Sequence, residues 1–207
     1  MRILFALVCT FAIFFSLPAP LPALETQNPL LEGVVLTIDG VPSSGTQITA
    51  WDGRTRFQTA TDKGGEFTIQ GITPGSIFAL RLSPKDFPST RIDGFRFPEQ
   101  GNLFISAENG NLSKGKNYTS KIPSNPTTGY SWSLLDPGNE AVIIFRENAT
   151  EQQKEIQPRG LAGKGGRELW TFEAAGRGVT AAVLGYRRSW ETGVSPHRYH
   201  ILVLNVR

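Results

Sequence analysis

The stretch from Ser124 to Trp132, SNPTTGYSW, combines residues that fix a backbone with residues that make contacts. Pro126 fixes its own φ and restricts the residue before it. Thr127 and Thr128 are β-branched and stiff about the first side-chain torsion, and Gly129 permits a positive φ or a close approach of another backbone. Because a loop that is already ordered loses little entropy on binding, the pattern predicts a rigid recognition loop. A plain turn is the alternative.

Two further segments carry residues suited to binding. GKGG at 163–166 precedes the strand-like run RELWTF, and its glycines let main chain lie close to a groove. RSW at 188–190 supplies an Arg and a Trp, which are the residue types most often found as interface hot spots. Taken alone, each segment has a simpler interpretation. A Gly-rich run is typical of a hairpin tip, and the pair Arg187 and Arg188 is typical of a solvated surface.

The sequence offers little for catalysis. His197 and His200 are three residues apart, so a strand places them on opposite faces and makes them a poor metal pair. The single cysteine, Cys9, lies in the N-terminal apolar run, which leaves the rest of the chain without a thiol nucleophile. No G-x-S-x-G elbow occurs, and SKGK at 113–116 is too generic for a Ser-Lys dyad. We expect neither an enzyme nor a cofactor or metal.

The three segments occur in the order seen in the chagasin family of cysteine-protease inhibitors, which residues 103–207 resemble. The hallmark loop of that family reads N-P-T-T-G-aromatic-x-W, and this chain matches it throughout. A G-x-G-G run and an R-P-W loop follow in the family. Here Ser189 replaces the Pro of the last loop, a departure that we expect to loosen the loop and weaken binding without abolishing it.

The resemblance implies an immunoglobulin-like sandwich whose loops at 125–130, 160–167 and 187–191 form a wedge. That wedge would enter the active-site cleft of a papain-like (C1 family) cysteine protease and inhibit it reversibly, with the first loop central and the others gripping either side. The residues implied in protease binding are Asn125, Pro126, Thr127, Thr128, Gly129, Tyr130, Gly163, Lys164, Gly165, Gly166, Arg188, Ser189 and Trp190.

The charge pattern bears on the kind of partner. The net charge is +3 and no basic tract occurs, so we expect no nucleic-acid partner. Basic residues flank two of the three loops and would steer the chain toward an acidic protease; they are Lys164, Arg167, Arg187 and Arg188. We expect a monomer.

The sequence pattern predicts that the segments flanking these loops are strands. Seven short runs with turn residues between them fill residues 103–207, as in an immunoglobulin-like sandwich. The last run, RYHILVLNV, is apolar on both faces, which predicts a strand in the middle of a sheet. Trp132 is expected to lie in the core rather than in a contact.

Residues 30–98 form another block of short strands and turns, so the fold class is all-β with two sandwiches. Asp62 to Gly65 is expected to close a hairpin, and Gly71 to Gly75 to form the next turn. TDKGGEFTIQGITPGSIFALRL resembles the carboxypeptidase regulatory-like, or transthyretin-like, sandwich family, which implies a fold but no particular function. FPEQGN at 97–102 is the expected junction, short enough for the blocks to pack against each other.

Residues 1–23 are predicted to be a signal peptide, because Arg2 precedes an apolar run and small and helix-breaking residues follow. The chain would then be exported, periplasmic or secreted, with no membrane contact after cleavage; a retained anchor is the alternative. An exported chain without disulfides must be held by packing alone. The alternative function is an exported two-sandwich module that binds a glycan or a protein and inhibits nothing.

Overall fold

The computed structural model describes residues 29–125, 128–152, 166–191 and 193–207. These residues form strands and turns and no α-helix, which confirms the predicted all-β class. The first block holds β1 (Leu30–Thr37), β2 (Gln47–Trp51), β3 (Arg56–Ala60), β4 (Glu66–Gln70), β5 (Ile77–Ser83) and β6 (Thr90–Arg96). The second block holds β7 (Leu103–Leu112), β8 (Asn117–Ser124), β9 (Tyr130–Asp136), β10 (Ile143–Gln152), β11 (Gly166–Ala174), β12 (Gly178–Arg188) and β13 (Arg198–Val206).

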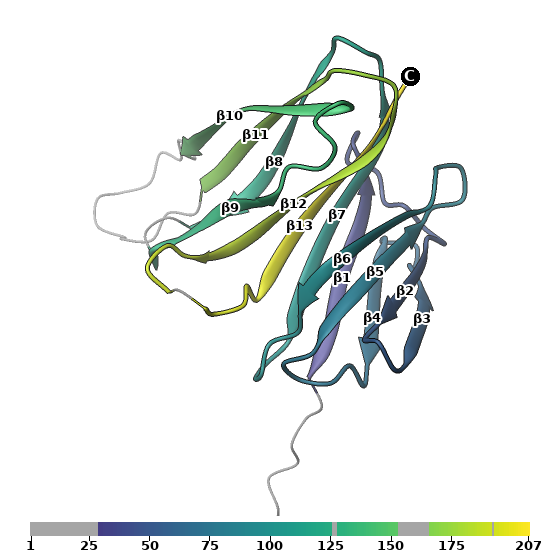
Figure 1. The fold of residues 1–207 in the computed structure, drawn as a ribbon, viewed down its shortest axis with the longest axis vertical. Coiled ribbons are helices and arrows are strands. Elements are labelled where there is room, and N and C mark those ends of the chain that lie inside the picture. The colour runs from purple at the N-terminus through teal and green to yellow at the C-terminus, as the bar shows by residue number, and fades with distance from the viewer. Residues whose placement is uncertain (1–28, 126–127, 153–165, 192) are drawn as a thin grey trace, which may run out of the picture.

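The strands build three sheets that stack in layers (Figure 1). The central sheet has six strands in the order β4-β1-β7-β13-β12-β9. A four-stranded sheet, β3-β2-β5-β6, covers one of its faces, and a three-stranded sheet, β10-β11-β8, covers part of the other. Two sandwiches therefore share one sheet.

Strand β13 shows why this sheet is central. Tyr199, Ile201 and Val203 point into the core under the four-stranded sheet. The alternate residues Leu202 and Leu204 point into the core under the three-stranded sheet. Because successive side chains of a strand point to opposite faces, a strand buried on both sides must be apolar throughout. β13 pairs with β7 and β12, so its predicted place inside a sheet is confirmed.

The first core, between the four-stranded and central sheets, joins residues from both halves of the chain. Phe78 and Phe95 stack with ring centroids 5.5 Å apart. Phe95 also meets Tyr199 of β13 edge to face at 5.0 Å. Such aromatic pairs add to the stabilisation from burial itself. The first block is thus held against the second by apolar contact.

The pairing of β1 and β4 was not predicted from the sequence. β1 pairs with β4 and, in parallel, with β7, so two strands of the first block lie in the central sheet. The predicted hairpin at residues 62–65 is therefore wrong, because β3 and β4 belong to different sheets. The turn itself is present: Asp62 Oδ1 accepts hydrogen bonds from the backbone of Gly64 at 2.8 Å and of Glu66 at 2.9 Å. Those residues suit a corner between sheets as well as a hairpin.

The junction between the blocks is tied to β1. The side chain of Asn102 accepts a hydrogen bond from the Leu30 backbone at 3.0 Å and donates one to Glu32 at 3.2 Å. The domain limits at 98 and 103 stay predictions. The predicted signal at 1–23 lies outside the described residues. Among those described, no helix is long and apolar enough to cross a membrane.

Candidate functional site

Strand register brings the three predicted loops to one end of the second sandwich. Ser124, the last residue of β8, pairs with Gly166, the first of β11, and Gly166 pairs with Gln152, the last of β10. In the central sheet Tyr130, the first residue of β9, pairs with Arg188, the last of β12. The chain therefore leaves or enters the strands at the same end for all three loops (Figure 1).

Trp190 lies against the first loop and is 65% exposed. Its ring sits over Gly129, whose φ is +77°, and a Cβ added at Gly129 would overlap the indole. Gly129 is thus required both by its backbone and by the close approach of Trp190. The Trp-bearing loop and the NPTTG loop form one contiguous surface.

The Arg188 side chain contacts aromatic residues of both the NPTTG loop and the Trp-bearing loop. Its guanidinium lies 4.6 Å from the ring centroid of Tyr130 and 5.9 Å from that of Trp190. It also forms an ion pair with Glu191 at 3.0 Å. Tyr130 stacks in turn on Tyr186 at 5.4 Å. Arg188 is therefore half-buried among aromatic rings, so its place in the structure is that of a support for the loop surface.

The first loop is also fixed by hydrogen bonds at its base. Thr128 donates to the carbonyl of Asn125 through its hydroxyl at 2.7 Å and through its backbone at 3.2 Å. The backbone N–H of Asn125 donates to the Tyr186 hydroxyl at 2.9 Å. These bonds close a tight turn in which Thr128 is exposed, next to the exposed Trp190 of the other loop.

The structure describes eight of the thirteen predicted binding residues and brings the described ones to one end. Gly166 begins β11 at that end, and Ser189 is exposed beside Trp190. Pro126, Thr127, Gly163, Lys164 and Gly165 lie outside the described residues.

Residues 111–203 match the chagasin family of peptidase inhibitors, I42. This chagasin-matching region covers less than half of the chain and spans β8 to most of β13. It contains all three loops. The family is one of inhibitors and not of enzymes.

Solved structures of similar fold include the cysteine protease inhibitor EhICP2 from Entamoeba histolytica, at 23% identity and a TM-score of 0.41, covering 51% of this chain and 96% of that one. Amebosin matches at 25% identity and a TM-score of 0.35, covering 52% of this chain and all of that one. PbICP-C, solved in complex with falcipain-2, matches at 19% identity and a TM-score of 0.38, covering 51% and 91%. No curated relative matches this chain significantly.

A buried carboxyl group holds the strand ends from which the loops of the chagasin-matching region emerge. Glu168 of β11 accepts hydrogen bonds at Oε1 from the Ser124 hydroxyl at 2.7 Å and from the Trp132 backbone at 3.2 Å. Its Oε2 accepts from the Trp170 indole at 3.3 Å. A buried carboxyl group needs such donors, because burying it without them is costly. Glu168 thereby ties the last residue of β8 to β9 and β11.

Trp132 lies in the second core, between the three-stranded and central sheets, as predicted, with 7% of its surface exposed. Its indole donates to the carbonyl of Pro123 at 3.1 Å, and its ring meets Tyr186 at 5.0 Å. In the chagasin-matching region this Trp therefore supports the loop base, whereas Trp190 provides the exposed aromatic surface.

His200 is the other buried titratable group of the second core. Its Nδ1 lies 2.8 Å from the Ser106 hydroxyl and its Nε2 lies 3.0 Å from the Ser120 hydroxyl. Burial lowers the pKa of His200 to about 3, so the ring is neutral at physiological pH. Burial also raises the pKa of the nearby Glu108, which accepts a hydrogen bond from Tyr118. A neutral His with both nitrogens satisfied is a structural group of the core.

The sequence predicted both histidines on one strand, with opposite orientations, but only His200 lies in β13. His200 is buried, and His197 is exposed just before the strand begins. No cluster of three or more His, Cys, Asp or Glu side chains suited to a metal occurs among the described residues.

Proposed function

We propose that the chain is a reversible protein inhibitor of papain-like cysteine proteases, and that its three loops at 125–130, 160–167 and 187–191 enter the active-site cleft. The observation that carries the proposal is the packing of Trp190 on Gly129. It joins the hallmark loop and the Trp-bearing loop into one exposed surface, within the region that matches an inhibitor family.

The physical basis of inhibition is a surface that is ordered before it binds. Hydrogen bonds close the turn at Asn125 and Thr128, and the packed rings of Tyr130, Tyr186 and Trp132 support the base of the loop. Such a loop loses little conformational entropy in a complex, and that favours slow dissociation. A loop held in its own fixed conformation would occupy the cleft without presenting a peptide bond in the geometry that the protease cleaves. The loop would therefore not be hydrolysed.

Export and the monomeric state belong to the same proposal. A chain cleaved after Ala23 would meet proteases outside the cytoplasm, and no described residue of the loop surface requires a second copy. The basic residues Arg167 and Arg187 near the loops would raise the association rate with an acidic protease at low salt.

The test is a titration of papain activity with the chain from Leu24 to Arg207. We expect inhibition at nanomolar concentrations that dilution reverses. Trp190→Ala removes the exposed anchor and should weaken inhibition by about thirtyfold, the equivalent of about 2 kcal/mol. Gly129→Ala should weaken it as well, because the new Cβ would displace the indole.

The matched control is Trp51→Ala, which removes another exposed Trp from the far sheet. It should inhibit papain as the unmodified chain does. Absence of inhibition at micromolar concentrations by a protein shown to be folded would overturn the proposal.

A further inference from the structure

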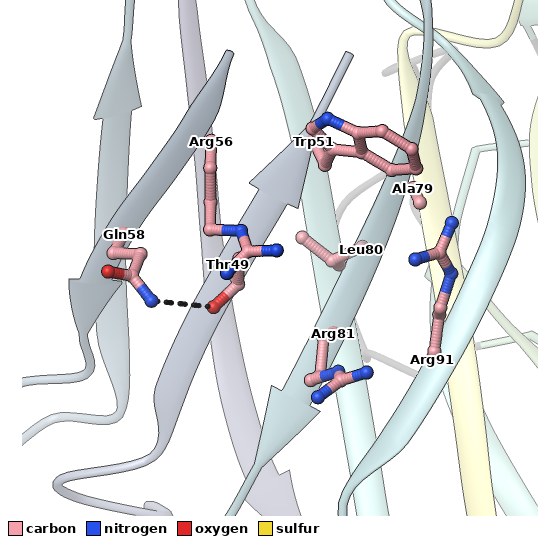
Figure 2. A pocket seen from close by; sticks show the side chains of 8 residues that line it. All are labelled: Thr49, Trp51, Arg56, Gln58, Ala79, Leu80, Arg81 and Arg91. Atoms are coloured by element: carbon pink, nitrogen blue, oxygen red, sulfur yellow. Dashed lines mark hydrogen bonds between the residues drawn. The ribbon is translucent and has the colours of Figure 1, made fainter. Parts of the chain in front are cut away.

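The outer face of the four-stranded sheet carries a second exposed tryptophan that the inhibitory loops do not use. Trp51 ends β2 and is 41% exposed. This face is turned away from the three-stranded sheet, because the central sheet lies between the two (Figure 1). Trp51 borders a shallow depression of about 140 Å³ (Figure 2).

Two rows of side chains cross this face, as the strand register defines. In one row Trp51 lies between Arg56 of β3 and Ala79 of β5. The indole extends over β5 toward Arg91 of β6, whose guanidinium is 5.2 Å from its ring centroid (Figure 2).

The other row consists of Gln58, Thr49, Arg81 and Arg91, one from each strand. The Gln58 amide donates to the Thr49 hydroxyl at 3.5 Å, and Arg81 stands directly opposite Arg91. Like charges directly opposite in a sheet are destabilising. Asp93 relieves part of this repulsion by pairing with Arg91, and an anion bound at Arg81 would relieve the rest.

The charges on this face are unbalanced. Arg91 forms an ion pair with Asp93 at 2.7 Å. Within the described part of the chain, Arg56 and Arg81 have no carboxylate at ion-pair distance. The guanidinium group binds carboxylate and sulfate oxygens through two parallel hydrogen bonds. Two such groups are therefore available on this face: Arg56 lies beside Trp51 in one row, and Arg81 lies in the other row, next to Thr49 and on the far side of Thr49 from Gln58.

We propose that this face binds an anionic polysaccharide, a chain of sugars that carry carboxylate or sulfate groups. Trp51 offers an apolar surface to a sugar ring, Thr49 and Gln58 offer hydrogen bonds to hydroxyl groups, and Arg56 and Arg81 bind the acidic groups. Single-stranded nucleic acid is the competing polyanion. It stacks successive bases on several aromatic rings, whereas Trp51 is the one aromatic that the lining of this depression contains.

The consequence is an inhibitor that can be held on an acidic polysaccharide while its loops stay accessible. The binding face and the loop surface belong to different sheets and do not share residues. This inference does not depend on the protease inhibition proposed above, since each surface is tested with its own ligand.

The experiment is affinity electrophoresis of the chain in gels that contain polygalacturonate, dextran sulfate or uncharged dextran. We expect retardation by at least one of the two acidic polymers and none by dextran, with salt weakening the interaction. Arg81→Gln should weaken binding by about tenfold, since hydrogen bonds to charged groups contribute at that level. Trp51→Ala, which removes the apolar surface for the sugar ring, should weaken binding to a similar degree. Thermal unfolding of each variant checks that it is folded.

Matched controls come from elsewhere in the chain. Trp190→Ala and Arg146→Gln remove an exposed Trp and an exposed Arg from the second sandwich, and should leave retardation unchanged. Asp93→Asn removes the carboxylate next to Arg91 and should strengthen binding, a gain that a folding defect cannot imitate.

Three results would overturn the proposal. One is no retardation by either acidic polymer. Another is equal retardation of Trp51→Ala, Arg81→Gln and the unmodified chain. The third is tighter binding of oligo(dT) than of both acidic polymers at equal charge concentration, which would make the face a nucleic-acid site instead.

Discussion

The two cores on either side of the central sheet differ in how they contain polar groups. The first core, under the four-stranded sheet, is built from aliphatic and aromatic side chains such as Phe78, Phe95 and Ile201. The second core, under the three-stranded sheet, is also apolar but surrounds the buried polar groups Glu168 and His200. The first core therefore stabilises the fold through apolar packing, which is not directional. The second core also contains directional hydrogen bonds, and these fix where strand ends and loops lie.

The largest expected effect breaks the apolar core and leaves the loops alone. Phe95→Ala removes the ring that packs on both Phe78 and Tyr199, and should lower the free energy of unfolding by about 3–5 kcal/mol. Denaturant unfolding measures this loss. Papain inhibition by the fraction that stays folded should not change. Ile77→Ala, at an exposed position in the same sheet, should alter stability by less than about 0.5 kcal/mol.

The next effect breaks the polar core. Glu168→Gln keeps the side-chain shape but replaces one acceptor oxygen with a donor that faces another donor, and should cost about 2 kcal/mol of stability. Unlike Phe95→Ala, it should also weaken papain inhibition by the folded protein, because the ends of β8 and β9 lose their common partner. Glu173→Gln on the same strand is the control. Unchanged inhibition by Glu168→Gln would show that this carboxyl does not position the loops.

The pH dependence of stability sharpens the same comparison. The pKa of His200 is about 3 in the folded protein against 6.5 as a free side chain, so between these values the unfolded state holds a proton that the native state lacks. Stability should therefore fall on acidification below pH 6.5, by up to about 1.4 kcal/mol per pH unit from this group. The raised pKa of Glu108 acts in the opposite direction above pH 4.5 and reduces the slope.

His200→Gln should flatten the acid side of the stability curve, whereas His197→Gln, at an exposed position, should leave it as it is. Denaturant unfolding between pH 4 and pH 7 measures both slopes. Identical slopes for His200→Gln and the unmodified chain would contradict the assignment.

The smallest expected effect separates the two roles of Tyr186. Tyr186→Phe keeps the ring under Tyr130 and Trp132 but removes the hydroxyl that accepts from the Asn125 backbone. We expect a loss of about 1 kcal/mol, seen more in papain inhibition than in unfolding, since the bond holds the loop. Tyr118→Phe, which removes a hydroxyl near the start of β8, at the opposite end of that strand from the loops, is the control and should inhibit normally.

The sequence predicted the strands of the second block well, because their alternation and turn residues are local signals. The β13 segment is apolar on both faces, and this also predicted that the strand lies in the middle of a sheet. The partners of β1 and β4 could not be predicted, because a strand's periodicity does not say which sheet it joins. The hairpin at 62–65 was wrong for the same reason: its turn residues fit a corner equally well.

Two residues that support the candidate site, Glu168 and Tyr186, were not singled out in the sequence. Glu168 did leave a signal. It has the same parity as Trp170 and Phe172 along β11, so a carboxyl stood at an inward position of a strand. Tyr186 left none, because its hydrogen bond to Asn125 depends on two strands that only the fold brings together.

Backbone hydrogen exchange of the chain bound to papain tests the central claim most directly, because it reports which amides the enzyme covers. The account predicts new protection at Thr128, Gly129 and Trp190 and none along β2 and β5 on the far sheet. Protection confined to the four-stranded sheet, or a complex that leaves these three amides exchanging as in the free chain, would contradict it.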